Sequence, residues 1–202
     1  TDENSKIHPS SIYGINKQQQ EQMVMLLGDA LGIPAVAFRY QNVFGPGQSL
    51  SNPYTGILSI FSTRILNGNN LDIYEDGLES RDFVYIDDVV DATILGIEKE
   101  QANGEVFNIG SGIATNVKEV AESLKKFYNS DITISISGKY RLGDIRHNYA
   151  DLNKAKNILC FTPKYNFQKG ISEFVNWVKT QEVMEDKYEK SVQELKDKGL
   201  MK

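Results

Sequence analysis

GDALGIPAVAFRY, residues 28 to 40, decides the fold of this sequence. A helical pattern ends at Gly32 and Pro34, because glycine tolerates the left-handed conformation of a helix end and proline cannot continue a helix. Residues 35–40 then form a short apolar run without alternation, which is typical of a strand buried on both faces of a parallel sheet. A helix that leads into such a strand predicts an α/β protein.

The pattern can be followed in both directions from this stretch. Upstream, apolar residues recur with a helical period from residue 11 to residue 31, which predicts a helix there. Downstream, the segment 42–54 is dense in Gly, Pro, Asn and Ser, so we expect a loop and a domain boundary. Further patterns predict strands over 71–76, 82–86, 105–110 and 133–137, and helices over 55–66, 88–99, 117–128, 151–159 and 167–178.

Capping residues support several of these helices. Asn116 and Glu119 have the spacing of a capping box for the helix 117–128, and Asp87 or Asp88 can cap the helix that ends near residue 99. Asp151 can cap the short helix that ends at residue 159. The tail over 182–202 is mostly charged, and a fraying helix is expected there.

Composition limits the classes of protein to consider. With 40% apolar and 24% charged residues among 202, the chain is an ordinary globular protein of one large or two small domains. The formal charge of −5 argues against a nucleic-acid partner held by a broad cationic face. The single cysteine, Cys160, lies in the apolar run NILCF and is expected to be buried, in a reducing compartment. No apolar run is long enough to cross a membrane, so we expect a cytoplasmic protein without a membrane partner.

Two Tyr-x-x-x-Lys pairs are candidates for proton transfer. Positions four apart on a helix share a face, so the ammonium of Lys17 would make the phenol of Tyr13 easier to deprotonate. The spacing alone is weak, because Tyr165 and Lys169 repeat it after a proline, where a solvated loop and a helix start are expected. The surrounding sequence must separate the two pairs.

Two loops imitate ligand sites. Gly110-x-Gly112 follows a predicted strand as in a dinucleotide fingerprint, but the third glycine is replaced by Thr115, so a plain strand-to-helix turn is favoured. The loop YRLGDIRHNYAD, residues 140 to 151, holds Arg141 close to Asp144. A guanidinium suits a diphosphate and a carboxylate can accept from a ribose hydroxyl, although a solvated loop with local ion pairs is the plainer explanation.

ESRDFVYIDDVVDA, residues 79 to 92, carries another charged cluster. Arg81 stands beside Asp82, for which a local structural ion pair is the plainer explanation. A metal site built from the four aspartates is less simple than helix capping, because no histidine is near, and no metal is expected. His8 and His147 are isolated and are assigned no role.

Together these segments resemble the C-terminal portion of NAD-dependent nucleotide-sugar epimerases and dehydratases, the extended short-chain dehydrogenase/reductase family that includes UDP-glucose 4-epimerase. The segments that occur in the order and approximate spacing of that family are SIYGINKQQQE, FRYQNVFGPGQ, NPY, ESRDFVYIDDVVDA, VFNIGSG and RLGDIRHNYADLNKA. The resemblance implies a remnant of a Rossmann sheet over 1–48 and a nucleotide-sugar-binding region over 49–180. Within the latter, 83–110 would pack back on the Rossmann part, and 181–202 would be a charged tail.

The resemblance also implies roles for individual residues. Tyr13 would exchange a proton with the sugar hydroxyl, Lys17 would hold the nicotinamide ribose of NAD, and Tyr40 and Gln41 would lie near the same cofactor. Hydride transfer from the sugar to NAD would give a 4-keto intermediate, and an epimerase would return the hydride to the other face. The nucleotide sugar would be bound through its diphosphate by Asn42, Arg81 and Arg141, through its ribose by Asp144, and around its base by Asp72, Ile73 and Tyr74.

One part of the family pattern, the glycine fingerprint G-x-x-G-x-x-G, does not occur in these 202 residues. We therefore expect a C-terminal fragment that does not bind NAD tightly and is inactive alone, with uncovered apolar surface that favours a homodimer or other self-association. FRYQNVFGPGQ and NPYTG resemble epimerases, which favours an epimerase with a UDP-sugar substrate. A nucleotide-sugar 4,6-dehydratase and a non-catalytic sugar-nucleotide binding module remain the alternatives.

Overall fold

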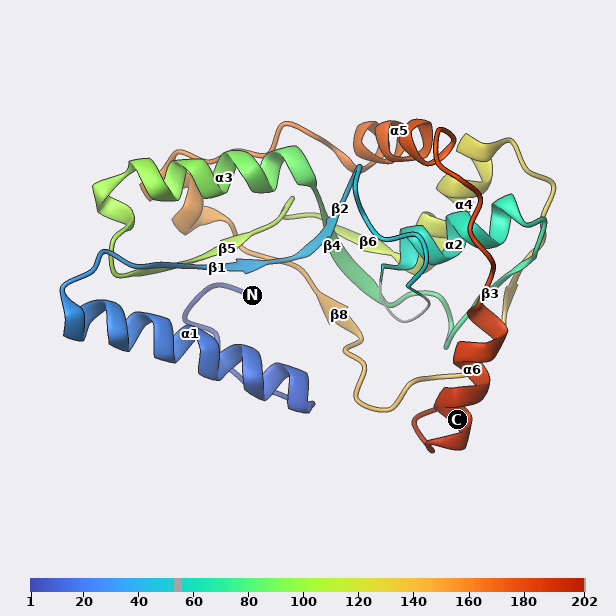
Figure 1. Ribbon diagram of the computed structural model, residues 1–202, viewed down its shortest axis with the longest axis horizontal. Coiled ribbons are helices and arrows are strands. Elements are labelled where there is room, and N and C mark those ends of the chain that lie inside the picture. Colours follow the sequence, from blue (N-terminus) through green and yellow to red (C-terminus); the bar gives the residue numbers. More distant parts are fainter. Residues whose placement is uncertain (53–55, 202) are drawn as a thin grey trace.

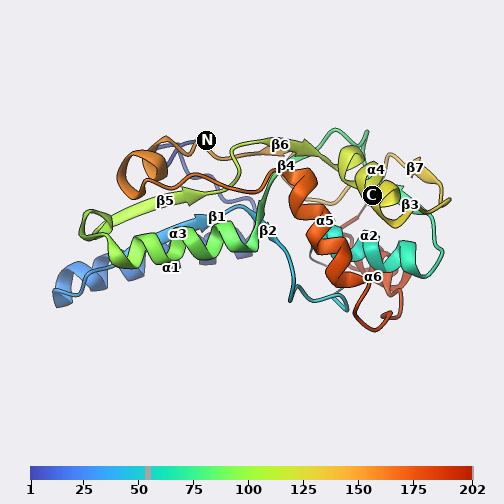
Figure 2. The ribbon, with the colours of Figure 1, turned by 90° about the horizontal axis from the view of Figure 1, so that it is seen from above.

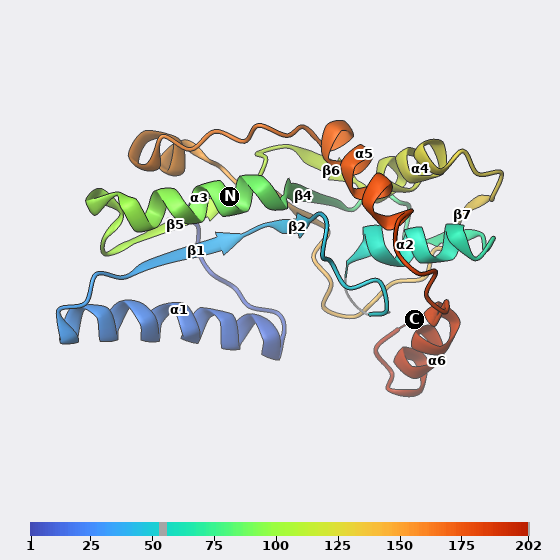
Figure 3. The same ribbon diagram turned by 45° about the horizontal axis from the view of Figure 1, so that its top comes forward.

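The elements of the chain form two lobes that lie side by side (Figure 1). The structure is a computed structural model that describes residues 1–52 and 56–201, so most of the NPY segment and residue 55, where a helix was expected to begin, lie outside it. In the first lobe, the parallel strands β1 (Val36–Tyr40) and β5 (Glu105–Ile109) lie between the helices α1 (Ile12–Leu31) and α3 (Ile86–Glu98). Figure 3 shows this layering, and the α/β prediction is confirmed.

The helix and strand around the opening stretch follow the predicted bounds. The side chain of Ser11 caps α1, and Gly32 ends it in the left-handed conformation. The prediction that the following strand is buried on both faces is wrong for the described residues. The side chains of β1 are mostly half-buried, because β5 is its one partner strand in the described part of the chain.

The chain first crosses from one lobe to the other in an extended stretch. β2 (Asn42–Phe44) follows β1 after one residue, Gln41, and pairs in parallel with β4 (Ser80–Tyr85) instead of β5. The backbone N–H of Gln41 still donates to the carbonyl oxygen of Ile109 at 2.9 Å, so the strand changes partners directly after this residue. The loop expected from residue 42 therefore begins only after Phe44.

The second lobe is built around β4. This strand pairs with β2, with the antiparallel strand β6 (Ala114–Asn116) and with the two-residue strand β8 (His147–Asn148), which the sequence did not predict. Figure 2 shows the remaining elements of this lobe gathered away from α1 and α3. They are α2 (Ile57–Leu66), α4 (Val117–Tyr128), α5 (Phe167–Val178) and the parallel pair β3 (Leu71–Ile73) and β7 (Ile134–Ile136).

Two amphipathic helices of this lobe confirm their predictions. At the start of α4, the backbone N–H of Glu119 donates to Asn116 Oδ1 at 2.8 Å, and the backbone N–H of Asn116 donates to Glu119 Oε2 at 3.1 Å, which is the predicted capping box. α5 begins at the predicted position. Its apolar face enters the core of the lobe through Ile171, Phe174, Val175 and Val178.

The predicted cap of α3 is wrong. The helix begins at Ile86, and no side chain caps it. The carboxylate of Asp88 instead accepts the backbone N–H groups of Lys164 and Tyr165, at 2.8 and 3.1 Å, and Asp87 accepts the hydroxyl of Tyr165 at 3.1 Å. These aspartates therefore anchor the segment before α5. Tyr165, the tyrosine of the second Tyr-x-x-x-Lys pair, thus already has a structural partner.

The C-terminal third departs from expectation at two places. Cys160 is exposed, in a left-handed conformation directly after the short helical turn η2 (Ala155–Leu159), while its neighbours Leu159 and Phe161 fill the core of the first lobe. The turn η1 (Glu100–Ala102) after α3 reaches the same core through its alanine. The charged tail forms the helix α6 (Tyr188–Asp197), which docks on the second lobe instead of fraying.

Within residues 1–52 and 56–201, no helix combines the length and the apolar character needed to cross a bilayer.

Candidate functional site

A pocket of about 230 Å³ opens in the second lobe. Its walls come from α2, β3, β4 and the loop between β7 and β8, with the first residue of α6 on one side. All seven residues predicted to bind substrate line this one pocket: Asn42, Asp72, Ile73, Tyr74, Arg81, Arg141 and Asp144. Because the fold gathers these distant residues in one place, the pocket is the candidate functional site.

Arg81 reaches the pocket from β4. Its Nη2 donates to Asp144 Oδ1 at 2.7 Å, and its Nη1 donates to the carbonyl oxygens of Ser80 and Arg146 at 2.9 and 3.1 Å. These partners fix the guanidinium against the loop between β7 and β8, where it can meet an anionic ligand. Arg81 does not pair with Asp82, so the local ion pair considered above is wrong.

Asp82 points away from the pocket, because successive side chains of a strand face opposite sides. Its carboxylate is 0% exposed and accepts from Ser111 N at 2.7 Å, Ser111 Oγ at 2.6 Å, Gly112 N at 2.9 Å and Ala150 N at 3.2 Å. Gly110 lies so close to this carboxylate that a Cβ there would collide with it. The glycine loop after β5 therefore encloses a carboxylate of the protein itself, in agreement with its interpretation as a plain strand-to-helix turn.

Arg141 brings a second guanidinium to the pocket. Its Cζ lies 5.5 Å from the ring centroid of Tyr74, within the range of a cation–π contact. Its Nε is buried and has no hydrogen-bond partner among the described residues. A buried donor without a partner costs about 1–3 kcal/mol, so a ligand oxygen that accepts from this nitrogen would be favoured.

Aromatic rings form the other end of the pocket. The hydroxyl of Tyr188, the first residue of α6, donates to the hydroxyl of Tyr74 at 2.9 Å, and both rings line the pocket. The sequence analysis missed Tyr188. A signal was present, because Tyr188, Val192 and Leu195 recur at helical spacing and form an apolar stripe in a charged tail.

An acidic group also lines the pocket, and the sequence analysis did not identify it. Glu79 is 8% exposed, and neither of its carboxylate oxygens has a hydrogen-bond partner among the described residues. Burial raises the pKa of Glu79, and the nearby carboxylates of Glu75 and Asp76 raise it further. Arg146 binds both neighbours at 2.6 Å, which leaves Glu79 as the acid without a cation.

Two of the candidate residues are held by strand pairing. Asn42 opens β2 opposite Phe83 of β4, which also lines the pocket. Asp72 lies on β3, and its Oδ2 accepts from Lys139 Nζ at 2.7 Å, a hydrogen bond that raises the pKa of Lys139. Both side chains therefore sit on rigid elements.

Tyr40 and Gln41 lie where β1 gives way to β2, outside the pocket. The hydroxyl of Tyr40 is 2.8 Å from Thr93 Oγ1 on α3. The side-chain oxygen of Gln41 accepts from Asn148 Nδ2 at 2.9 Å. Both residues mark the carboxyl end of β1, the edge where open α/β sheets bind ligands.

Tyr13 and Lys17 lie in the first turns of α1, also outside the pocket. Tyr13 is 72% exposed, and Lys17 Nζ lies 5.6 Å from its ring centroid and donates to Gln20 Oε1 at 3.3 Å. Just before the helix, Ser10 Oγ donates to the carbonyl oxygen of Gly143 at 3.3 Å. The start of α1 therefore touches the loop that supplies two of the pocket residues.

The residues predicted to contact NAD fit that cofactor in kind. A phenol and an ammonium on neighbouring turns of α1 can both bond to ribose hydroxyls. In the part of the chain that the structure describes, however, they do not line the pocket of the second lobe, and the side chains of Tyr40 and Gln41 already have partners inside the protein. Tyr13 and Lys17 are both exposed at the start of α1.

Comparison with known proteins places the chain in one family. A family model described as the NAD dependent epimerase/dehydratase family matches residues 1–110. The chain is 38% identical to a dTDP-L-rhamnose 4-epimerase of Burkholderia thailandensis over 170 residues, which are 84% of this chain and 47% of the relative.

Two solved structures show the same fold. A UDP-glucose 4-epimerase of Thermotoga maritima, solved with UDP-glucose, matches with a TM-score of 0.81 and 36% identity over 89% of this chain and 57% of the other. A UDP-glucuronic acid 4-epimerase of Bacillus cereus, solved with UDP-glucuronic acid and NAD, matches with a TM-score of 0.80 and 27% identity over 89% and 56%.

The chain spans about half the length of these relatives. The family model covers more than half of the chain, and the neighbours share its α/β fold, so the resemblance found in the sequence is confirmed. The chain belongs to the NAD-dependent epimerase/dehydratase family, whose members are enzymes.

Proposed function

We propose that this chain carries the substrate-binding part of an NAD-dependent nucleotide-sugar 4-epimerase. The observation that supports this proposal is the pocket of the second lobe, which combines two guanidinium groups, carboxylates and aromatic rings. Guanidinium groups suit a diphosphate, a carboxylate suits ribose hydroxyls, and an aromatic ring suits a base. The chain has a net charge of −5, so two arginines that converge on one pocket favour a ligand of negative charge at that place.

Each pocket residue has a distinct role in this proposal. Arg81 and Arg141 bind the diphosphate, and Asn42 adds an amide donor beside them. Asp144 already accepts from Arg81 through Oδ1, so it can orient that arginine while it accepts from a ribose hydroxyl. Tyr74 lies against the base, in a wall that Asp72 and Ile73 continue.

Tyr13 is the proposed acid/base. When the sugar carbon is oxidised, its hydroxyl loses a proton, which the phenolate of Tyr13 accepts, and Lys17 stabilises that phenolate. NAD supplies the hydride-accepting chemistry in this family. Because Tyr13 is exposed, we propose that the 202 residues alone do not bind NAD tightly and do not turn over substrate. Calorimetric titration with NAD tests this, and micromolar affinity would contradict it.

The names of the relatives favour an epimerase over the alternatives. Two of the proteins described above act as 4-epimerases on UDP-sugars and one on a dTDP-sugar, according to their names. A 4,6-dehydratase would bind a similar diphosphate, and a binding module would need the pocket alone. The nucleotide therefore has to be measured and not assumed.

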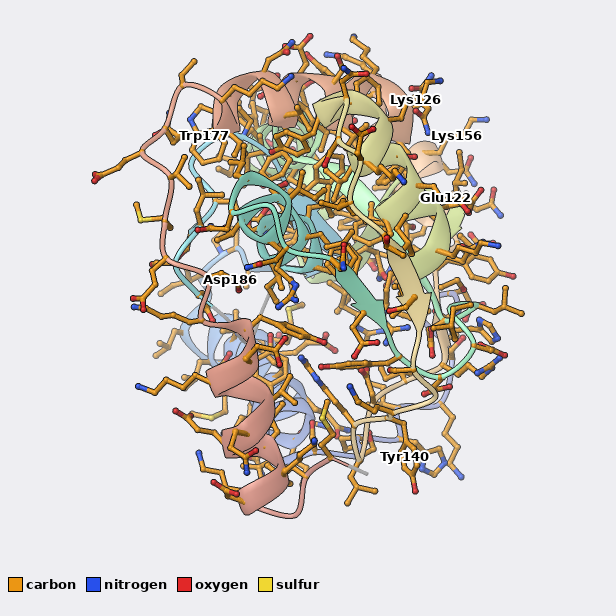
Figure 4. The ribbon with its side chains drawn as sticks, turned by 90° about the vertical axis from the view of Figure 1, so that its right-hand side faces the viewer. Glu122, Lys126, Tyr140, Lys156, Trp177 and Asp186 are labelled. Atoms are coloured by element: carbon orange, nitrogen blue, oxygen red, sulfur yellow. The ribbon has the colours of Figure 1, made fainter. Side chains whose placement is uncertain are left out.

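The test is the thermal shift of the chain with UDP-glucose, dTDP-glucose and GDP-mannose. A ligand at a hundredfold excess over Kd stabilises the folded state by about 2.7 kcal/mol. We expect a shift with one nucleotide, which Arg81→Ala and Arg141→Ala abolish. Lys126→Ala, which removes one positive charge from the exposed face of α4 (Figure 4), should keep it. No shift with any nucleotide would contradict the proposal.

We also propose that α1 is a contact surface for a second copy of the chain. Its exposed aliphatic side chains are Ile12, Ile15, Met23, Val24, Leu26, Leu27 and Leu31. An apolar row of this kind on one helix is unfavourable in water and is expected to associate. Sedimentation equilibrium should show a dimer that Leu26→Glu weakens, and a monomer at all accessible concentrations would contradict this.

A further inference from the structure

The tail of the chain is anchored to the second lobe by polar contacts. Arg64 of α2 is buried, and its guanidinium lies 3.3 Å from Asp186 Oδ2 and 3.3 Å from Glu189 Oε1. Asn69 Nδ2 donates to the same oxygen of Asp186 at 2.7 Å. Figure 4 shows Asp186 on the extended segment just before α6 begins. The start of α6 is thereby fixed at one edge of the pocket.

Tyr188 joins this anchor to the pocket. It is 5% exposed, its ring lies 4.1 Å from Arg64 Cζ, and its hydroxyl donates to the hydroxyl of Tyr74. Burial and the bond to Tyr74 raise the pKa of Tyr188, so it remains a phenol and keeps its proton for this bond. The hydrogen of the Tyr74 hydroxyl is then free to donate elsewhere.

The last residues of the tail hold the other side of the pocket. The carbonyl oxygen of Leu200 accepts the backbone N–H of Leu142 at 3.0 Å, and Met201 pairs with Arg141 as an isolated antiparallel bridge. Met201 is buried with Tyr188 in one small apolar cluster. In Figure 4 the segment that follows α6 accordingly runs toward the segment that carries Tyr140. The tail therefore touches two pocket residues that are far apart in the sequence: Tyr74 through Tyr188, and Arg141 through Met201.

We propose that residues 186–201 form the outer wall of the pocket and position Tyr74 for the nucleoside part and Arg141 for the diphosphate of a nucleoside diphosphate. This inference rests on the proposed function and deepens it. Tyr188 acts through Tyr74 and is a positioning residue. Arg141 lies in a loop with little regular structure, and its bridge to Met201 ties its backbone to the segment that follows α6. A freely placed loop would lose part of its binding free energy to ordering on contact with the ligand.

The first test compares Tyr188→Phe and Tyr188→Ala with the unchanged chain. Calorimetric titrations use UDP, dTDP, GDP and inorganic pyrophosphate as probes. We expect Tyr188→Ala to weaken the preferred nucleoside diphosphate about tenfold or more, and Tyr188→Phe to weaken it several-fold, because only the hydroxyl bond is lost. Pyrophosphate binding should change less than twofold. Lys190→Ala, on the exposed side of α6, is the matched control.

The outcomes separate this inference from the proposed function. If the unchanged chain binds a nucleotide and both Tyr188 variants bind it equally well, the inference fails alone. Equal losses for the nucleotide and for pyrophosphate would also overturn it, since they would show a general structural effect. If the unchanged chain binds none of the nucleotides, the proposed function fails and the inference with it.

A second variant needs no ligand. A chain that ends at Gly199 lacks the carbonyl group that accepts from Leu142 and the partner of Arg141. We expect faster hydrogen exchange at the amide of Leu142, with unchanged exchange in the distant helix α3. Unchanged exchange at Leu142 would overturn the positioning role of the tail.

Discussion

Replacement of Asp82 by asparagine tests how the two lobes are joined. The two carboxylate oxygens accept four hydrogen bonds, from two groups of Ser111 and from the backbone N–H groups of Gly112 and Ala150. An amide has one acceptor oxygen, so two of these donors would face an NH₂ group. At about 1.5–3 kcal/mol for each hydrogen bond to a charged group, Asp82→Asn should lower the free energy of unfolding by about 3–6 kcal/mol.

The assay is equilibrium unfolding in urea. A loss of this size is a large part of the stability of a typical domain, so the midpoint should move by more than the error of the method. Asp131→Asn makes the same chemical change at an exposed position and should alter the free energy of unfolding by less than about 0.5 kcal/mol. A loss below about 1 kcal/mol for Asp82→Asn would refute the reasoning, because it would mean that the four bonds are not made or are replaced by water.

Three further predictions concern single side chains. Glu79→Gln should stabilise the protein at pH 8 and lose this advantage toward pH 4. The reason is that burial raises the pKa of Glu79 in the folded state. The unchanged protein therefore loses stability as the pH rises from the unfolded-state pKa of Glu79 through its folded-state pKa. Urea unfolding at both pH values measures this, and an equal gain at both would contradict it. Tyr13→Phe should leave the thermal shift with UDP-glucose or dTDP-glucose unchanged, because Tyr13 lies outside the pocket; a lost shift would place it inside. Cys160 should react fully with a thiol reagent in the native protein, and protection until unfolding would contradict its exposure.

Local signals in the sequence were sufficient for much of the fold. Gly32 ends α1 in the left-handed conformation, and the Asn116–Glu119 box starts α4, because both depend on neighbouring residues and on backbone geometry. The placement of Asn42, Arg81 and Arg141 around one pocket also agrees with the predicted site residues, although that expectation came from the resemblance to a family and not from periodicity. Their roles in binding remain proposals.

The features that the sequence did not predict depend on distant partners. The partners of Asp82 lie 29 to 68 residues away, so its neighbour Arg81 was the nearest apparent partner. Cys160 stands in an apolar run, yet a left-handed turn directs it outward, and no local pattern marks that turn. The three residues of β2 are too few to show a periodic pattern. The change of partner strand, from β5 for β1 to β4 for β2, also leaves no signal in the amino-acid composition.

The alternation of side chains along β4 and the residues just before it explains how one segment serves both the fold and the site. Glu79, Arg81 and Phe83 face the pocket, while Asp82 binds the glycine loop after β5 and Val84 enters the core of the first lobe. Because the period of a strand is two, a shift of one residue would exchange these faces. It would place a carboxylate where Arg81 now lines the pocket and a guanidinium against backbone N–H groups that need an acceptor. The hydrogen bonds at Asp82 therefore favour the register that presents Arg81 to the pocket, so we expect a substitution on the far face of the strand to weaken the proposed ligand binding without touching the ligand.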